Sequence, residues 1–462
     1  MNTKTERITN TLGTEPVGKL IKKYATPCVI SLVVNGLYNI VDQIFIGHGV
    51  GYLGNSATNV VFPLTIFSAA LGVLLGDAAA TYMSLKLGEG KPQKANRGVA
   101  GGITMSIAVS VVLLITCVIL LKPIIYLFGC TETVEPYAMS YGGIVVLGFP
   151  FVIISTALNS MIRADGSPKL AMASLVTGAI FNTIADPIFI FLFDWGIEGA
   201  AIATIMGQFL SLLISLSYMK KWKSVTLAKA DFRWDWQTTK EMLPLGIASF
   251  INQMATVIMT AIINITLIRY GKDSVYGTDI PLAVMGITLK INQIFLFIII
   301  GIATGAQPII SFNYGARTYS RVLEALKICM VSAFLISAIA FCVFQFAPMS
   351  VVSLFGTEND LYNEFAIKSL RIFLLFCILN GYQTVASIFV QAIEKPAHAL
   401  LLSLSRQIVF LIPLVLLLPK WLDIDGVLWA GPMADGLAFV LAFCIQTRAI
   451  KDIKNKLKTI KA

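Results

Sequence analysis

The chain of 462 residues is 56% hydrophobic and only 13% charged, with a mean hydropathy of +0.80. These values exclude an ordinary soluble globular protein and predict a protein that lies in a lipid bilayer. The formal net charge of +10 does not indicate nucleic-acid binding, because Lys and Arg gather in alternate loops between apolar segments. The seven cysteines are scattered without CxxC spacing, which argues against a disulfide framework and a thiolate metal site.

The N-terminal residues are polar and show no cleavable signal peptide, so the first apolar segment is expected to stay in the protein. Segments of roughly 20 apolar residues, each long enough to cross a hydrocarbon core about 30 Å thick, then recur along the chain. The sequence therefore predicts an all-α polytopic membrane protein with twelve transmembrane helices. The expected spans are residues 24–47, 58–83, 98–121, 137–162, 170–193, 197–219, 241–268, 281–309, 321–346, 362–392, 397–418 and 424–447.

The longest polar interruption, residues 220–240, separates six spans from six and predicts a cytoplasmic linker between two lobes. The expected lobes are residues 1–219 and 241–447, followed by a basic cytoplasmic tail at 448–462. A short string recurs in both halves, since Ser84-x3-Gly88 is repeated as Ser311-x3-Gly315. Self-similarity of this kind indicates a duplicated unit, and an even number of crossings per half predicts two pseudo-symmetric lobes in the same orientation.

Basic residues also predict the topology. With twelve spans and the N-terminus inside, the outer loops hold only Lys122, Arg269, Lys272 and Lys420. The positive-inside rule then predicts that both termini are cytoplasmic. No phosphate-binding GxxxxGK[ST] loop and no His/Cys/carboxylate cluster with metal-ligand spacing is present, which argues against an ATP-driven pump and against an enzyme.

A carboxylate inside an apolar span needs a partner, a proton or a water-filled cavity, because burying its charge costs at least ~2.5 kcal/mol. In the first span Asn35, Tyr38, Asn39 and Asp42 have the spacing i, i+3, i+4 and i+7, which places them on one helical face. Acidic and polar residues recur in the fifth span as "FNTIADP" and in the sixth span at Thr204.

In the fifth span Asn182 and Asp186 are four residues apart and share a face. Counted from the span ends, Asp42, Asp186 and Thr204 lie at similar depths of roughly 6 to 10 Å. Such a layer would provide oxygen ligands for a hard cation, or a carboxylate pair that shares a proton. The alternative is that Asn182 and Asp186 only cap a helix break before Pro187.

The second half has no equivalent acidic layer, which favours a functional role for the first. Lys290 lies near the middle of its span beside Asn292 and Gln293, and it is either a charge gate or a lysine satisfied by neighbouring amides. For Arg371 and Arg406, which lie in or at the ends of spans, we prefer an ordinary structural role. For Asp77 we prefer a capping role, at the start of a half-helix after Gly76.

Several strings resemble the multidrug and toxic compound extrusion (MATE) family, in particular its MepA-like bacterial branch. They are "LGTEPVGKLIKKYATPCVISLVVNGLYNIVDQIFIGHGVG", "GDAAATYMSLKLGEG", "NTIADPIFI", "GIEGAAIAT" and "GAQPIISFNYGA". The resemblance covers nearly the whole chain and implies two six-helix lobes. It also implies that Asp42, Asn182, Asp186 and Thr204 form an ion-coupling site, and that the first helix bends at Pro27.

The chain departs from another branch of that family, which carries acidic residues in the seventh and tenth helices. Here the seventh helix offers Asn252 and Gln253, and the tenth offers Asn380, Gln383 and Gln391. Ion coupling through the second lobe is therefore not expected. Candidate residues of the substrate cavity are Asn35, Tyr38, Asn39, Lys290, Asn292 and Gln293.

The expectation from sequence is a secondary transporter that exports cationic amphipathic drugs in exchange for Na⁺ or H⁺. We expect a monomer in a bacterial inner membrane, with no cofactor other than the coupling ion and no nucleic-acid partner. A flippase of lipid-linked saccharides is the main alternative, although its anionic substrates would call for a basic cavity. A passive cation channel is a further alternative, and a membrane-embedded enzyme is the least favoured.

Overall fold

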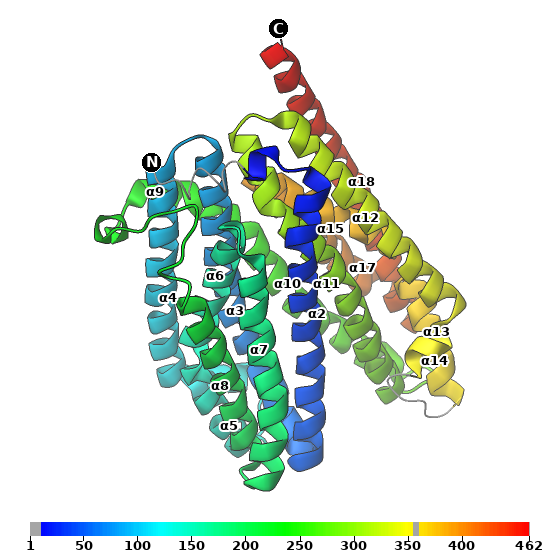
Figure 1. The fold of residues 1–462 in the computed structure, drawn as a ribbon. Helices are drawn as coiled ribbons and strands as arrows, with labels where there is room; N and C mark the ends of the chain where they lie inside the picture. The colour runs from blue at the N-terminus through cyan, green and yellow to red at the C-terminus, as the bar shows by residue number, and fades with distance from the viewer. Residues whose placement is uncertain (1–10, 354–359, 462) are drawn as a thin grey trace. The chain divides into compact units, whose positions relative to one another are not determined.

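A computed structural model describes residues 11–353 and 360–461 of the chain (Figure 1). The part of the chain that it describes is almost entirely α-helical. Ten helices are long and apolar enough to cross a membrane, and two bent helix pairs raise the number to twelve if each pair counts as one span. The predicted fold class, an all-α polytopic membrane protein, is confirmed.

The helices of the first half are α2 (Val17–Gly49), α3 (Tyr52–Gly88), α4 (Pro92–Leu127), α5 (Glu135–Leu147), α6 (Phe149–Ala164), α7 (Pro168–Pro187), η1 (Ile188–Leu192) and α8 (Gly196–Leu216). The predicted linker contains the short helices η2 (Lys229–Phe232) and α9 (Trp236–Met242). The remaining helices are α10 (Pro244–Gly271), α11 (Asp279–Gly315), α12 (Tyr319–Phe346), α13 (Pro348–Val352), α14 (Asp360–Phe373), α15 (Cys377–Ala392), α16 (Pro396–Leu404), η3 (Ser405–Leu411), α17 (Ile412–Leu417) and α18 (Pro419–Lys461).

Two of the expected spans are each formed by two helices. The segment predicted at 137–162 bends by 45° between α5 and α6, and the segment predicted at 362–392 bends by 48° between α14 and α15. The first bend has a clear cause, because Pro150 in the first turn of α6 cannot donate a backbone hydrogen bond to the preceding turn. The break also places Gly148 close to α8, because a Cβ atom added there would lie 2.6 Å from the Ile205 side chain.

The structure divides into two compact units. Unit 1 comprises Met1–Gln253 with Ser311–Thr318, and unit 2 comprises Met254–Ile310 with Tyr319–Ala462. The division lies within α10 and α11, which both continue from one unit into the other. The lobe boundaries expected from the sequence, at residues 219 and 241, stay a prediction.

Unit 1 is a helix bundle in which α7 packs on both α2 and α8, while α3 packs on α4 and α6 (Figure 1). Two glycines determine how closely α7 and α8 approach each other. A Cβ atom added at Gly178 would lie 2.7 Å from the carbonyl oxygen of Gly207, and one added at Gly207 would lie 2.7 Å from that of Gly178. Because α7 and α8 cross at these two glycines, polar residues one turn away on each helix come together.

Asp77 corrects one sequence-based prediction. Helix α3 continues through Gly76 without a break, so Asp77 does not cap a half-helix. Its carboxylate accepts hydrogen bonds from Ser160 (3.0 Å) and Ser249 (2.9 Å), and Arg163 lies 3.7 Å away. The small residue Gly76 instead allows close packing, because a Cβ there would lie 2.8 Å from the Cα atom of Ala157.

In unit 2, α18 packs against α14, α15 and α17, and α15 also packs against α12. Aromatic rings of Tyr382, Phe439 and Phe443 fill part of the contact between α15 and α18. The helix α18 changes direction at Asp423, whose φ of 47° lies in the left-handed region, and then remains helical through Lys461.

Candidate functional site

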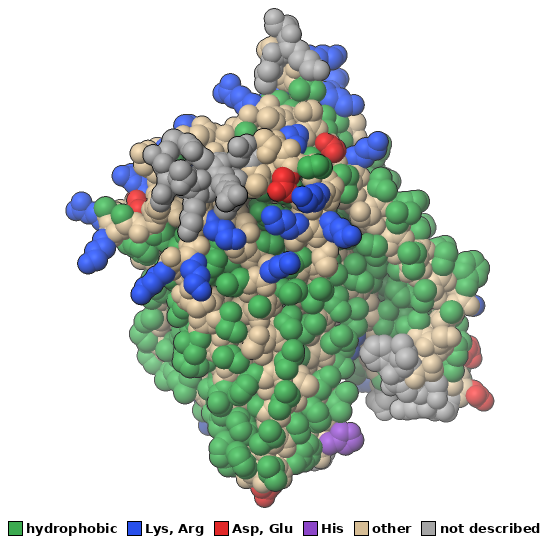
Figure 2. All heavy atoms as spheres, viewed as in Figure 1, with side chains coloured by type: hydrophobic (Ala, Val, Ile, Leu, Met, Phe, Trp, Pro, Cys, Tyr) green, Lys and Arg blue, Asp and Glu red, His purple; other side chains and the backbone are tan. Residues whose placement is uncertain are grey.

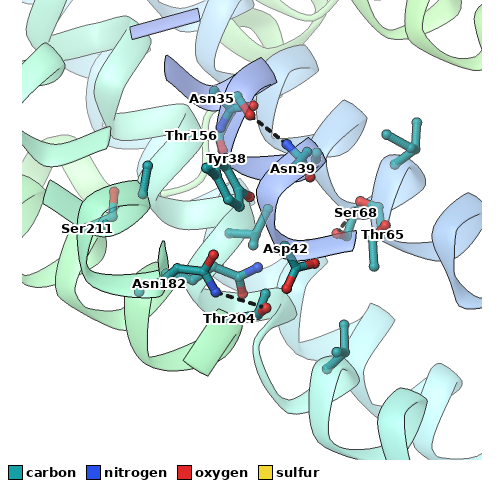
Figure 3. Close-up of a pocket in the computed structure, with 18 of the residues that line it drawn as sticks. Asn35, Tyr38, Asn39, Asp42, Thr65, Ser68, Thr156, Asn182, Thr204 and Ser211 are labelled. Carbon is teal, nitrogen blue, oxygen red and sulfur yellow. Dashed lines mark hydrogen bonds between the residues drawn. The ribbon is translucent and has the colours of Figure 1, made fainter. Parts of the chain in front are cut away.

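A cavity of about 240 Å³ lies inside unit 1, between α2, α3, α5, α6, α7 and α8 (Figure 3). Its polar lining residues are Asn35, Tyr38, Asn39, Asp42, Gln43, Thr58, Thr65, Ser68, Tyr141, Ser155, Thr156, Asn182, Thr204, Gln208 and Ser211. Phe62 and Phe149 add aromatic surface. Among the described residues that line this cavity, none is Lys, Arg or His.

The polar face expected on the first span lines this cavity. Asn35, Tyr38, Asn39 and Asp42 all reach it from α2, as their helical spacing predicts. Asn39 donates a hydrogen bond of 2.7 Å to the backbone carbonyl of Asn35, one turn earlier in the helix (Figure 3). Pro27 lies within α2, three turns before Asn39, and the bend expected there stays a prediction.

The glycine crossing of α7 and α8 brings Asn182 and Thr204 together. The side-chain amide of Asn182 donates to the Thr204 hydroxyl (3.4 Å) and to Asp186 Oδ1 (3.1 Å). Figure 3 shows Asn182 and Thr204 below Tyr38, on the same side of the cavity as Asp42. Asn182 and Asp186 are both buried, with 2% and 0% of their surface exposed.

Asp186 does not serve as a helix cap. Asp186 Oδ1 accepts a hydrogen bond from the side-chain amide of Asn182, and Oδ2 accepts none from the described residues. The chain continues from Pro187 directly into the π-helical turn η1. Pro187 lacks a backbone N–H, so the regular helical pattern is interrupted there, and π-helical turns are frequent at functional sites. The capping alternative raised by the sequence is therefore not supported by the geometry.

The carboxyl groups of Asp42 and Asp186 lie close enough to interact with each other. Three buried oxygens at this point accept no hydrogen bond from the described residues: Asp42 Oδ1, Asn182 Oδ1 and Asp186 Oδ2. Buried acceptors without donors are costly, and two adjacent carboxylates repel each other. A proton or a hard cation would offset both costs, so the donor set fits Na⁺ or H⁺.

The other cavity candidates lie in unit 2. Lys290, Asn292 and Gln293 belong to the part of α11 assigned to that unit, and they are not among the lining residues of the cavity described here. Asn292 is buried, and its Oδ1 has no donor among the described residues. Their role in a substrate cavity stays a prediction.

The two arginines of the second half differ from each other. Arg371 is exposed and donates from Nε to the backbone carbonyl of Gln345 (3.1 Å), which is an ordinary structural role. Arg406 is not at a span end: it is buried in the π-helical segment η3 and donates from Nε to Asp435 Oδ1 at 2.6 Å. An ion pair of this kind fits the structural role preferred for Arg406.

Sequence reasoning also missed Asp435, which is 2% exposed in α18. The signal was available, because "GPMADGLAF" carries a carboxylate inside the last apolar span. Asp435 of unit 2 thus has a cationic partner, whereas Asp42 has none among the described residues that line the cavity of unit 1.

Ten to twelve candidate membrane spans in the described part of the chain, with a polar cavity between helices of unit 1, define a multi-pass membrane protein of the transporter type. The chain belongs to the MatE family, whose model matches residues 27–188 and 248–417. Members of this family are transporters, so the expectation that the chain is not an enzyme is confirmed, as is the resemblance found in its sequence motifs.

Among curated proteins, the multidrug export protein MepA of Staphylococcus aureus (strain MSSA476) is 25% identical over 434 residues, which are 93% of each chain. MepA of Staphylococcus haemolyticus (strain JCSC1435) is 24% identical over 449 residues, 96% of this chain and 95% of the relative.

Solved structures also resemble this fold. An outward-facing multidrug resistance MATE transporter of the MOP superfamily has a TM-score of 0.89 at 23% identity, covering 96% of this chain and 98% of its own. A MOP superfamily transporter from Pyrococcus furiosus, with a binding pocket of reverse polarity that suggests a different function, has a TM-score of 0.88 at 23% identity with the same coverage. At this identity the likeness establishes the fold alone.

Proposed function

We propose that the protein is a secondary multidrug efflux transporter, which exports cationic amphipathic compounds in exchange for Na⁺ or H⁺. Membership of the MatE family and the likeness to MepA proteins named as multidrug exporters support the transport function. The observation that carries the cationic specificity is the cavity in unit 1, which combines the carboxyl group of Asp42, aromatic rings and no basic lining residue among those described.

The coupling mechanism that we propose is competition at the acidic layer. When Na⁺ or a proton binds beside Asp42 and Asp186, it neutralises negative charge and weakens the attraction of the cavity for a cationic compound. The ion therefore favours release of the drug. Net export requires that ion and drug stabilise different conformations, since a ligand that binds both states equally shifts neither.

The lining of the cavity also bears on the alternative function. A flippase of lipid-linked saccharides moves anionic substrates, which a basic cavity would attract and an acidic one would repel. The described lining residues offer Asp42 and several neutral groups, with no cation to hold a phosphate. The reverse pocket polarity named for the Pyrococcus furiosus protein belongs to that protein, and the fold alone does not decide the substrate.

The deciding experiment is efflux of a fluorescent organic cation from proteoliposomes with an imposed Na⁺ or H⁺ gradient. We expect gradient-driven export by the wild-type protein and its loss in Asp42→Asn, because that change removes the charge that both ligands need. Asp194→Asn is the matched control, since Asp194 is exposed and lies outside the cavity. Normal export by Asp42→Asn at normal expression would contradict the proposed role of Asp42, and no export under either gradient would favour the flippase.

We also propose a bacterial inner membrane as the location, with both termini in the cytoplasm. The support is the distribution of basic residues between alternate loops and the bacterial origin of the MepA relatives. Fluorescent-protein fusions to each terminus test the orientation, because the reporter matures on the cytoplasmic side.

A further inference from the structure

Exposed aromatic and basic side chains lie together in the segment that joins α8 to α10. Phe232, Trp234 and Trp236 are 38%, 59% and 59% exposed. The ammonium group of Lys240 lies over the Trp236 ring, 5.3 Å from its centroid. Exposed tryptophans beside Lys and Arg are typical of the boundary between membrane and water.

This segment covers a small groove on α4. Both η2 and α9 pack against α4, and the groove between them is lined by Arg97, Gly101, Arg233, Trp234 and Thr238, among others. A Cβ atom added at Gly101 would meet nothing within 4 Å, so the floor of the groove is open. Arg97 from α4 and Arg233 from the linker both line this groove, which encloses only about 10 Å³, so a larger ligand would lie at its mouth.

Below the groove, one face of α4 is continuously apolar from Ala108 to Ile119. Arg97, Gly101, Thr104, Ala108, Val112, Ile115 and Ile119 have the three- and four-residue spacing of one helical face. Val112, Ile115 and Ile119 are 64%, 54% and 71% exposed. At 1.5 Å per residue this face runs roughly 33 Å from Arg97 to Ile119, about the thickness of a hydrocarbon core, and its apolar part begins at Ala108. Arg97 thus lies at one end of the segment expected to cross the membrane.

The space-filling view agrees with this placement. Figure 2 shows Lys and Arg side chains gathered at the end of unit 1 where Figure 1 places α9, and mostly hydrophobic side chains on the flank beyond them. A lipid molecule that lies against this flank has its acyl chains beside apolar residues and its headgroup beside basic ones.

The ion pair with Asp235 does not use all the hydrogen-bond donors of the Arg97 guanidinium group. Asp235 accepts hydrogen bonds from the backbone N–H of Gln237 (3.0 Å) and the hydroxyl of Thr238 (2.7 Å), so it is held as the cap of α9. Arg97 Nη1 lies 3.7 Å from Asp235 Oδ2, too far for a strong hydrogen bond, and the Arg97 side chain is 58% exposed. Its guanidinium group keeps donors for a second anion.

We propose that this groove binds an anionic phospholipid. In this arrangement the guanidinium groups of Arg97 and Arg233 hold the phosphate, Trp234 lies at headgroup level and one acyl chain follows the apolar face of α4. Guanidinium groups suit phosphate because they donate two parallel hydrogen bonds. A zwitterionic lipid is disfavoured, because its ammonium group would lie beside two guanidinium groups.

Lipid titration with native mass spectrometry of the detergent-solubilised protein tests the proposal. The probes are phosphatidylglycerol and phosphatidylcholine with identical acyl chains. We expect the wild type to hold at least one phosphatidylglycerol preferentially, and Arg97→Gln with Arg233→Gln to lose that molecule, with affinity reduced on the order of tenfold. Lys19→Gln with Lys122→Gln is the matched control, because it removes the same charge from other exposed side chains of unit 1.

Three results would overturn the proposal: equal binding of both lipids, unchanged phosphatidylglycerol binding in the Arg97/Arg233 variant, or equally tight binding of soluble glycerol 3-phosphate. Quenching by brominated lipids in nanodiscs gives a second measurement. A variant that keeps Trp234 and Trp236, with Trp195, Trp222, Trp421 and Trp429 changed to Phe, reports on the groove alone. Brominated phosphatidylglycerol is expected to quench this variant more than brominated phosphatidylcholine, and equal quenching would contradict the assigned headgroup.

Discussion

At the scale of single residues, Asp165 is a buried carboxyl group outside the membrane-spanning helices. It lies between α6 and α7 with 0% of its surface exposed. It accepts hydrogen bonds of 2.7 Å from the Tyr218 hydroxyl and from the backbone N–H groups of Lys223 and Ser224. These contacts attach the beginning of the predicted linker to the α6–α7 turn.

Burial raises the pKa of Asp165 to about 6, although the hydrogen bonds from Tyr218 and the backbone partly oppose the shift. A raised pKa means that the protonated form is favoured by folding. Its contribution to stability is complete below pH ~4 and is lost as the pH rises through 6, with a maximum on the order of 3 kcal/mol. We therefore expect this attachment to be more stable at pH 5 than at pH 7.

Asp165→Asn tests this expectation because an amide does not titrate. The melting temperature of the variant, relative to the wild type, is expected to be lower at pH 5 than at pH 7, since the wild type gains stability on acidification and the variant does not. Melting curves at both pH values in detergent measure this difference. A pH-independent difference would show that Asp165 does not titrate in this range. Asp194→Asn, at an exposed position, controls for the general effect of losing a carboxylate.

At the scale of helices, the crossing of α7 and α8 determines whether the polar layer forms. Any side chain at Gly207 would collide with the backbone of Gly178, so Gly207→Ala must push the helices apart. We expect a loss of about 1–3 kcal/mol in unfolding free energy, together with weaker drug export, because Asn182 and Thr204 then separate.

Gly143→Ala is the matched control for this variant, because a Cβ at Gly143 in α5 meets nothing within 4 Å. Replacing this helical glycine by alanine is expected to raise stability slightly, by about 0.5–1 kcal/mol. Melting temperature and proteoliposome efflux measure both variants. Unchanged efflux in stably folded Gly207→Ala would show that the crossing does not position the polar layer.

These elements also show what the sequence can predict. Helical spacing placed Asn35, Tyr38, Asn39 and Asp42 on one face correctly, because the period of the α-helix is fixed. A common site for Asn182 and Thr204 was predicted from similar depth and from the family resemblance, but their direct hydrogen bond was not. The Gly178–Gly207 crossing that creates this contact leaves no periodic or polar signal in one sequence.

Breaks and buried partners were harder to predict. Pro150 indicates the 45° bend at Gly148. The apolar segment nevertheless continues through the bend, so the sequence predicts a single span there. The prediction for Asp77 was wrong and the partner of Arg406 was not predicted, because an isolated polar residue in a span does not reveal its partner. Ser249 is 172 residues from Asp77 in the chain, and Asp435 is 29 from Arg406.

At the scale of the whole molecule, the two halves share a repeated sequence but treat their buried acids differently. Asp435 of unit 2 is paired with Arg406, which neutralises it without an ion. Asp42 and Asp186 of unit 1 lie next to each other instead. One oxygen of each carboxyl group, and the side-chain oxygen of Asn182, accept no hydrogen bond from the described residues. A duplicated fold therefore places its unneutralised negative charge in one half, and this asymmetry predicts where ions act.

Drug binding to the detergent-solubilised protein tests that asymmetry. If one acidic layer binds ion and drug in competition, saturating Na⁺ or low pH should weaken drug affinity about 5- to 150-fold, the usual range of coupling free energies. Linkage requires the drug to weaken ion binding by the same factor. Asp42→Asn should remove this ion dependence altogether.

Asp435→Asn should behave in the opposite way. It leaves Arg406 buried without its carboxylate, so we expect a loss of stability of about 3–5 kcal/mol while the ion dependence of drug binding persists. Melting temperature and equilibrium drug binding at several ion concentrations measure both effects. If Asp435→Asn abolished the ion dependence in protein that is still folded, the coupling charge would not be confined to unit 1. Carboxyl groups in both halves would then take part in the coupling of ion and drug binding, although only Asp42 lines the cavity in unit 1.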